Sequence, residues 1–205
     1  RHMVETAVHA AALTRKVQRP DLLLFAALFH DIGKGTQEDH SERGVRLIEP
    51  IAQRIGFDAK DIEVLKNLVL HHLLLSSTAT RRDLDDPATI ASVVSLVPDV
   101  NTLELLHALS IADGEATGSA GWSEWKATLV NDLVQRVKRA MAGAEVAQQP
   151  EVSQEQIAQA EKGVLRVTLE EHSSGYAVEV ISPDKPGLLS IVAGVFNISR
   201  LDVKS

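Results

Sequence analysis

Phe25-Ala26-Ala27-Leu28-Phe29-His30-Asp31-Ile32-Gly33-Lys34-Gly35 is the stretch from which the fold can be worked out. It continues a Leu-rich run that starts at Pro20 and is apolar nearly all round, which predicts a helix buried in the middle of a domain. Two glycines break this helix directly after His30 and Asp31. A charged Asp at the end of a buried helix is costly unless a cation or strong donors compensate it. The pair therefore indicates either a helix cap or a cation site.

Histidine and aspartate residues on other predicted helices favour the cation site. His40 starts the helix after the Gly-rich break, His72 shares a face with apolar residues of the helix that follows Asp58, and Asp113 lies inside an apolar helix. Several inward-facing residues of ligand type in one helical domain favour a shared cation. Because the chain has no cysteine, its N and O ligands suit Mg, Mn, Fe or Zn, and the ligand types do not choose among these metals. We take Mg or Mn as the first expectation. Such a metal supports hydrolysis because it lowers the pKa of bound water.

The spacing of these residues resembles the H…HD…D signature of the HD superfamily of metal-dependent phosphohydrolases, and two further histidines match its two-metal members. The resemblance implies six metal ligands: His2, His30, Asp31, His40, His72 and Asp113. We predict catalytic roles for Asp31, which would chelate one metal or bridge two, and for Lys34, whose ammonium group can hold phosphate oxygens. Arg81 and Arg82 are further cations on a segment that borders this site, with a solvated loop as the alternative. His-Met is a frequent scar of expression vectors, so His9 is the alternative to His2.

Longer motifs resemble one family within this superfamily, the bifunctional uridylyltransferase/uridylyl-removing enzymes of the PII nitrogen-signal system. The motifs are residues 25–35, Asp39-His40-Ser41, His72-Leu73-Leu74, the segment 78–83, Asp86-Pro87 and Trp122-Ser123-Glu124-Trp125-Lys126. The resemblance implies a phosphodiester hydrolase that removes a uridylyl or adenylyl group from PII in nitrogen regulation. It also implies a nucleotidyltransferase domain before residue 1, so we expect the chain to be a fragment of a multifunctional enzyme.

The C-terminal part of the chain changes from a helical period to a period of two. Residues 164–170 and 176–181 alternate as strands do, and Asp184-Lys185-Pro186-Gly187 opens a helix, after which 201–204 begins another strand. This order resembles the start of an ACT domain, a ferredoxin-like α/β unit that binds glutamine or another small amino acid when complete. The predicted fold class is mainly α, with an HD domain over 1–142, a linker and short helix over 143–163, and a partial ACT unit over 164–205.

Charge and hydropathy exclude other classes of partner. The formal net charge of −7 argues against binding of nucleic acid or a membrane surface. No apolar run is long enough to span a bilayer and no signal-peptide pattern opens the chain, so a cytoplasmic protein is expected.

Two other functions are compatible with this organisation. One is a guanosine tetraphosphate hydrolase of the Rel/SpoT type, which carries acidic residues soon after the HD pair where this chain has Gly33-Lys34-Gly35. The other is a regulatory HD-ACT module without catalysis, against which the intact His and Asp set argues.

Three local expectations concern the helices themselves. Val4 and Val8 mark the apolar face of the first helix, together with Ala11 and Ala12. Pro50 predicts a kink or an end in the third helix. The polar segment 76–86 is expected to be a loop.

Overall fold

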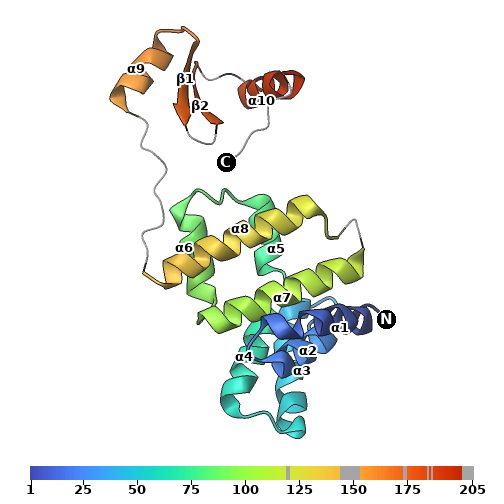
Figure 1. The fold of residues 1–205 in the computed structure, drawn as a ribbon. Helices are drawn as coiled ribbons and strands as arrows, with labels where there is room; N and C mark the ends of the chain where they lie inside the picture. The colour runs from blue at the N-terminus through green and yellow to red at the C-terminus, as the bar shows by residue number, and fades with distance from the viewer. Residues whose placement is uncertain (119–120, 144–152, 173–174, 184, 186, 200–205) are drawn as a thin grey trace. The chain divides into compact units, whose positions relative to one another are not determined.

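The computed structural model describes residues 1–118, 121–143, 153–172, 175–183, 185 and 187–199. They belong to two compact units, Arg1–Gln149 and Pro150–Ser205. The first unit is built from helices, and the second contains helices and a two-stranded sheet (Figure 1). The prediction of a mainly helical chain with a small α/β part is confirmed.

The α-helices of the first unit range from 8 to 18 residues in length. They are α1 (His2–Leu13), the 3-10 helix η1 (Thr14–Lys16), α2 (Pro20–Phe29), α3 (His40–Ile55), α4 (Ala59–Leu70), α5 (Leu74–Arg81), α6 (Pro87–Leu96), α7 (Val100–Thr117) and α8 (Glu124–Met141). Five of them begin at a residue whose side chain accepts a hydrogen bond from the first turn: Asp39, Asp58, Asp86, Asp99 and Ser123. These caps satisfy backbone N–H groups that the helix leaves free, which explains why the helices start where they do.

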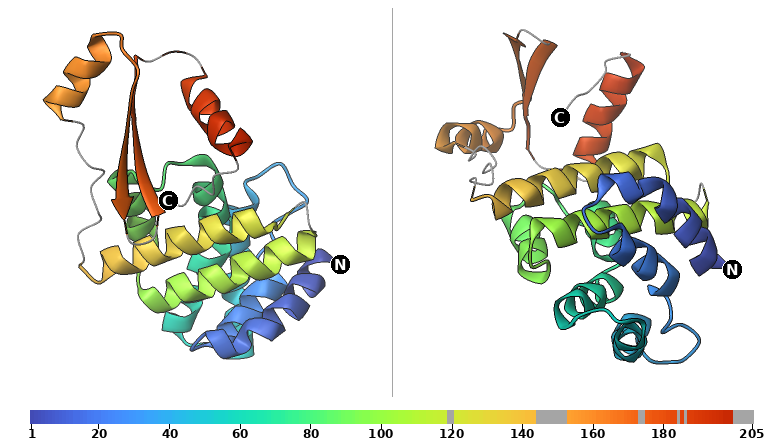
Figure 2. Two further views of the ribbon diagram at one scale, coloured as in Figure 1. Left: turned by 45° about the horizontal axis from the view of Figure 1, so that its top comes forward. Right: turned by 60° about the horizontal axis from the view of Figure 1, so that its bottom comes forward.

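The central helix is α7, which contacts α1, α2, α4, α5 and α8. Figure 2 shows α7 and α8 running beside one another across the helical unit. Leu103, Leu106 and Leu109 of α7 are fully buried. The expectation that α2 is buried all round is only partly right, because Leu24 is 36% exposed and Leu28 is 38% exposed. Their side of α2 faces solvent, and α7 takes the middle of the domain.

Segment 76–86 is not a loop throughout, because α5 covers its first half. Leu75 is fully buried and Ala79, one turn later, is 4% exposed, so the two form an apolar contact face on an otherwise polar helix. That face packs against α7 and α8. Two apolar residues at i and i+4 are enough to dock a helix of this length, which the polar composition of the segment conceals.

The inward face of α1 also differs from the prediction. Val4 and Val8 are 59% and 67% exposed, whereas Thr6 and Ala10 are fully buried against α2 and α7. The inward face also contains Leu13, which is 8% exposed, and it carries His2 to Asp113 of α7. In α3 the helix continues through Pro50 to Ile55, so this proline does not end it.

The second unit contains α9 (Gln154–Glu161), β1 (Arg166–His172), β2 (Gly175–Ile181) and α10 (Leu188–Ile198). The strands pair antiparallel, with Arg166 opposite Ile181. Gly187 precedes α10 with φ of 79°, a backbone conformation that favours glycine. The predicted strand over 201–204 lies outside the described residues.

Among the described residues, no single helix is long and apolar enough to cross a membrane. Helices α6 and α7 satisfy that length and composition only when taken together, across a bend of 100°.

Candidate metal centre

The centre of the candidate site is the turn at the end of α2. His30 continues the helical hydrogen bonding, since its N–H donates to the carbonyl oxygen of Ala26 over 2.7 Å, and the chain then turns at Asp31. The His30 side chain is fully buried and that of Asp31 is 5% exposed. The apolar residues of α2 therefore carry an ionisable pair into the interior of the domain.

The two most buried histidines share one backbone arrangement. Nδ1 of His30 lies 2.9 Å from the carbonyl oxygen of Ala27, and Nδ1 of His72 lies 2.7 Å from that of Val69. A carbonyl oxygen only accepts, so each Nδ1 must carry the hydrogen and donate it. This leaves Nε2 of each ring directed at the site, which is how proteins orient a histidine that binds metal.

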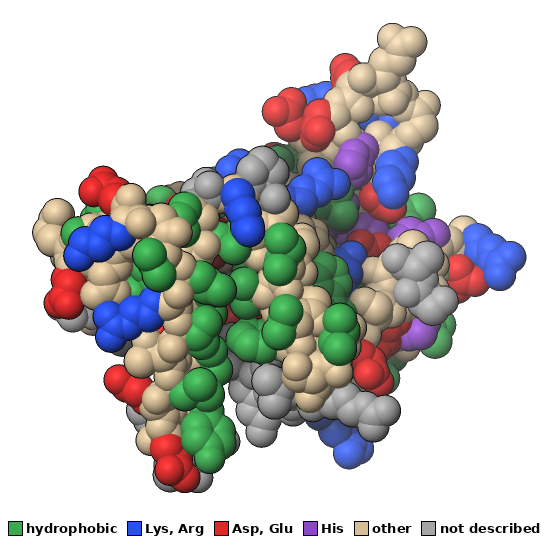
Figure 3. Space-filling view, turned by 90° about the horizontal axis from the view of Figure 1, so that it is seen from above, with side chains coloured by type: hydrophobic (Ala, Val, Ile, Leu, Met, Phe, Trp, Pro, Cys, Tyr) green, Lys and Arg blue, Asp and Glu red, His purple; other side chains and the backbone are tan. Residues whose placement is uncertain are grey.

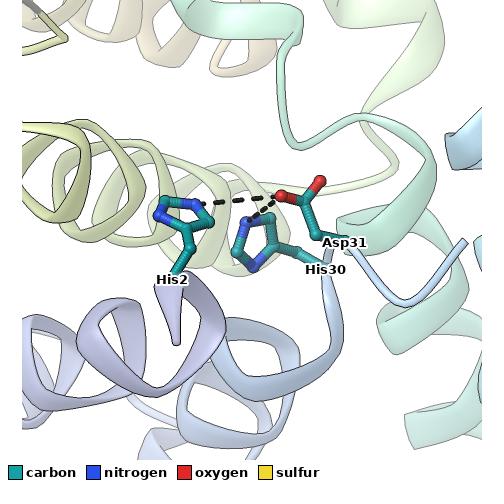
Figure 4. A group of neighbouring side chains, drawn as sticks. All are labelled: His2, His30 and Asp31. Atoms are coloured by element: carbon teal, nitrogen blue, oxygen red, sulfur yellow. Dashed lines mark ion pairs between the residues drawn. The ribbon is translucent and has the colours of Figure 1, made fainter. Parts of the chain in front are cut away.

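The carboxylate of Asp31 lies between two pairs of histidines. Its Oδ2 is 3.4 Å from Nε2 of His30 and 3.8 Å from Nε2 of His2, as drawn in Figure 4. Its Oδ1 is 3.6 Å from Nε2 of His72 and 3.9 Å from Nε2 of His40. Each oxygen thus belongs to a different cluster of three ligand atoms, one with His2 and His30 and one with His40 and His72. The arrangement offers one or two positions for a cation.

A second carboxylate closes the first of these clusters. Asp113, on α7, places Oδ1 2.8 Å from Nε2 of His2 and 3.2 Å from Nε2 of His30. Burial alone would lower the pKa of His30, but the carboxylates of Asp113 and Asp31 outweigh it and raise that pKa to about 9. Burial would raise the pKa of Asp31, but His30 and Lys34 hold it well below its usual range. Two ionised carboxylates thus surround one buried imidazole and favour a positive charge there, carried by the protonated ring or by a bound cation.

Three buried atoms at this point have no hydrogen-bond partner among the described residues: Nε2 of His30, Oδ1 of Asp31 and Nε2 of His40. Buried polar atoms are normally paired, so three unpaired ones beside each other need an explanation. All three are good ligands for a divalent cation, and one cation in each cluster would satisfy them. The residues present therefore fit a divalent metal.

One side of the cluster is open to solvent. The side chains of His2 and His40 are 34% and 28% exposed, whereas that of His72 is 1% exposed. Figure 3 shows histidine side chains next to acidic ones at the surface of the molecule. Lys34, whose side chain is 59% exposed, places Nζ 2.5 Å from Oδ2 of Asp31. A ligand can reach the cluster from this side and meets the Lys34 ammonium group there.

Close backbone contacts set the distance between the His30-Asp31 turn and α3. A Cβ on Gly33 would overlap the carbonyl oxygen of His40, and a Cβ on Gly44 would lie 2.7 Å from a methyl group of Val69. Arg43 donates from Nη1 to the carbonyl oxygen of Gly33 over 3.1 Å. Arg43 and Gly44 were not predicted as part of the site. A glycine inside a helix was the available signal, since it costs stability unless close packing requires it.

The structure brings together all seven predicted site residues: His2, His30, Asp31, Lys34, His40, His72 and Asp113. His9 instead pairs with Glu115, Nδ1 to Oε2 over 2.9 Å, and is 40% exposed. Arg81 and Arg82 line a separate pocket, none of whose lining residues is one of the seven.

Comparison with known proteins agrees with this geometry. Residues 1–115 match the model of the HD domain. This chain belongs to the HD domain family. The match covers more than half of the chain and includes every predicted site residue, so the expected fold family is confirmed.

The chain is also similar to bifunctional uridylyltransferase/uridylyl-removing enzymes. It is 60% identical to that of Streptomyces coelicolor over 143 residues, which is 70% of this chain and 17% of the relative. It is 46% identical to that of Mycobacterium tuberculosis over 208 residues, covering 100% of this chain and 26% of the relative. The enzyme of Azotobacter vinelandii is 38% identical over 77% of this chain. The resemblance seen in the sequence is confirmed, and the chain spans about a quarter or less of the length of these relatives.

Proposed function

We propose that this chain is a metal-dependent phosphodiester hydrolase that removes a nucleotidyl group from the PII signal protein in nitrogen regulation. The observation that supports it most directly is the set of unpaired buried ligand atoms around Asp31. The names of the relatives favour a uridylyl over an adenylyl group. The guanosine tetraphosphate hydrolase is disfavoured because Lys34, a cation, stands close after the HD pair where that class carries acids.

His2, His30, Asp31, His40, His72 and Asp113 would hold one or two divalent cations, with Mg or Mn proposed first. When bound, the metal would lower the pKa of a water molecule and neutralise charge on the phosphoryl oxygens. The reaction adds water across the P–O bond that joins the nucleotide to the protein, so that a nucleoside monophosphate and a free protein hydroxyl are released.

The residues of this chain prepare the site for that reaction in three ways. The backbone carbonyl groups of Ala27 and Val69 fix the rings of His30 and His72, so that both Nε2 atoms point at Asp31. The buried side chains of the cluster exclude water from one side, which strengthens electrostatic interactions within it. Lys34 brings a positive charge to the open side, where the anionic phosphodiester would approach.

The organisation of the chain is part of the proposal. Residues 1–142 would form the HD hydrolase domain, 143–163 a linker with a short helix, and 164–205 the first part of an ACT domain. A complete ACT domain would bind glutamine or another small amino acid and report it to the hydrolase. We also propose a cytoplasmic protein with no nucleic-acid or membrane partner, in line with the net charge of −7.

Incubation of uridylylated PII with the purified chain and Mn²⁺ or Mg²⁺ tests this function. We expect release of UMP, with loss of the modification seen by mass spectrometry of PII. Asp31→Asn should abolish the release, whereas Asp132→Asn, which changes an acid on the surface of α8, should leave it unchanged. Cleavage of guanosine tetraphosphate with retention of the uridylyl group would favour the Rel/SpoT alternative. Metal binding without cleavage of either substrate would favour the regulatory module.

A further inference from the structure

A polar pocket lies between α5 and α6, and none of its lining residues belongs to the cluster around Asp31. Its volume is about 640 Å³, and its lining includes Ser77, Thr78, Arg81, Arg82, Thr89 and Ser92. Pockets of this size hold small molecules, whereas protein-docking surfaces are usually flatter. The volume of the pocket is therefore sufficient for a small ligand.

Two guanidinium groups give this pocket its charge. Arg81 lies in the last turn of α5 and Arg82 follows it directly. In the part of the chain that the structure describes, neither side chain forms an ion pair or a hydrogen bond, whereas Arg19 and Arg136 each pair with two acids. Arginine is the side chain whose rigid fork of donors best matches a phosphate group. Arg15 and Arg54 also lack an ion pair within the described residues, so Arg81 and Arg82 are distinguished by being adjacent and by lining one pocket.

The acids closest to these arginines in the sequence already have other contacts. Oδ1 of Asp86 accepts from the backbone N–H of Ala88 and caps α6. Oδ1 of Asp85 accepts from Arg136, and Oδ1 of Asp83 accepts from the backbone N–H of Asp85. These contacts hold the carboxylates in the turn between α5 and α6. They leave the guanidinium groups available to a ligand, in a pocket whose lining also includes Asp86 and carries a formal charge of +1.

The hydroxyl groups of the pocket complete a set of donors. Ser77, Thr78 and Thr89 have no side-chain hydrogen bond within the described residues, and Ser92 donates to the carbonyl oxygen of Thr89 over 2.7 Å. Three free hydroxyl donors beside two guanidinium groups suit a ligand with several oxygen acceptors. The backbone amide of Ala88 at the start of α6 is already occupied by Asp86, so side chains define the site.

We propose that this pocket binds a phosphate-bearing small molecule of the size of a nucleoside monophosphate, as an anion site separate from the metal centre. Helix α5 lines the pocket along its length. Its first residue, Leu74, lies two residues after His72, and its last residue, Arg81, lies seven residues after Leu74. Seven residues of α-helix span roughly 10 Å. None of the residues that line the pocket belongs to the metal cluster, so the proposed anion site goes beyond the hydrolase function and should bind its ligand with or without metal.

Titration of the full ¹⁵N-labelled chain with UMP and with inorganic phosphate, in EDTA at constant ionic strength, tests the proposal by NMR. We expect saturable shifts in the amide signals of residues 77–82 and 88–92 with both probes, or with UMP alone if the nucleoside contributes. The double variant Arg81→Gln/Arg82→Gln should weaken binding about tenfold or more. The matched variant Arg15→Gln/Arg54→Gln removes two exposed charges elsewhere and should bind like the unmodified chain. Arg81→Lys/Arg82→Lys, which keeps the charge but loses the fork, should bind with intermediate affinity.

Three results would overturn the proposal. One is the absence of saturable shifts in 77–92 with either probe. Another is an equal loss of affinity in the matched variant, which would indicate general attraction between charges. The third is binding of a glutamate-rich peptide at these residues with no response to phosphate or UMP, which would make the pocket a protein-docking site. Thermal unfolding of each variant shows whether it is folded. If the glutamine variant is not folded, the affinity of the lysine variant for UMP and phosphate tests the proposal instead.

Discussion

Nε2 of His30 lies 3.2 Å from Oδ1 of Asp113, yet the two atoms are not aligned for a hydrogen bond. The imidazole is fully buried, and Asp31 approaches the same nitrogen to 3.4 Å. Two carboxylates and a ring nitrogen are the ligand types found at cation sites. Because the nitrogen is not hydrogen-bonded to either carboxylate, a hydrogen-bonded network does not explain their closeness. This contact is where we expect a metal ion to bind.

Replacement of Asp31 by Asn should remove metal binding and leave the fold intact. The amide has the same size as the carboxylate but lacks its charge, and Asp31 belongs to both clusters of ligand atoms. We expect the affinity for Mn²⁺ to fall by a factor on the order of 100 or more. Isothermal titration measures the affinity, and circular dichroism should show an unchanged helical signal. Unchanged Mn²⁺ affinity would show that the carboxylate is not a ligand.

Replacement of Gly33 by Ala should disturb the site, and the same change at Gly35 should not. A Cβ on Gly33 overlaps the carbonyl oxygen of His40, whereas one on Gly35 meets no atom within 4 Å. We expect Gly33→Ala to cost about 3 kcal/mol of unfolding free energy and to weaken Mn²⁺ binding by moving His40. Gly35 has φ of 97°, so Gly35→Ala costs only the backbone strain, about 1 kcal/mol. Urea denaturation of both variants compares them, and equal costs would contradict the close contact.

The ion pair between Arg19 and Asp61 should make stability depend on pH in the acid range. Nη1 and Nη2 of Arg19 contact the two carboxylate oxygens of Asp61 at 2.6 and 2.7 Å. This contact lowers the pKa of Asp61, so its contribution is present above the unfolded pKa and is lost as pH falls through the folded one. Asp61→Asn should cost about 1 kcal/mol at neutral pH and nothing once the carboxyl is protonated. Denaturation of both proteins from about pH 6 down to about pH 2 measures this, and a difference that stays constant would refute it.

The helical state of α5 can be tested at two leucines. Leu75 is fully buried and Leu73, just before the helix, is 46% exposed. If segment 74–81 packs as α5, Leu75→Ala should cost roughly 2–5 kcal/mol and Leu73→Ala less than about 1 kcal/mol. Chemical denaturation gives both values. Similar small losses of stability at the two positions would contradict a packed helix and favour the loop that the composition predicts.

The sequence predicted the members of the site better than it predicted the contacts that hold them. The sequence showed four ionisable residues at positions on apolar helices: His30, Asp31, His72 and Asp113. The structure brings their side chains into contact. Their function as metal ligands stays a prediction.

The helix faces were harder to predict because tertiary contacts overrode local composition. On α1 the valines pointed to the wrong face, since the inward side is occupied by His2 and Thr6. On α5 the buried residues are Leu75 and Ala79 alone. Hydropathy averaged over the whole segment would not reveal two such residues.

Anomalous diffraction from crystals of this chain soaked in Mn²⁺ shows whether Asp31 and its neighbouring histidines hold a metal. We expect a peak within bonding distance of a carboxylate oxygen of Asp31 and of Nε2 of His30, and a second peak beside His40 and His72 if two metals bind. Electron density in which all these side chains are ordered, with no anomalous peak among them at saturating Mn²⁺, would contradict it.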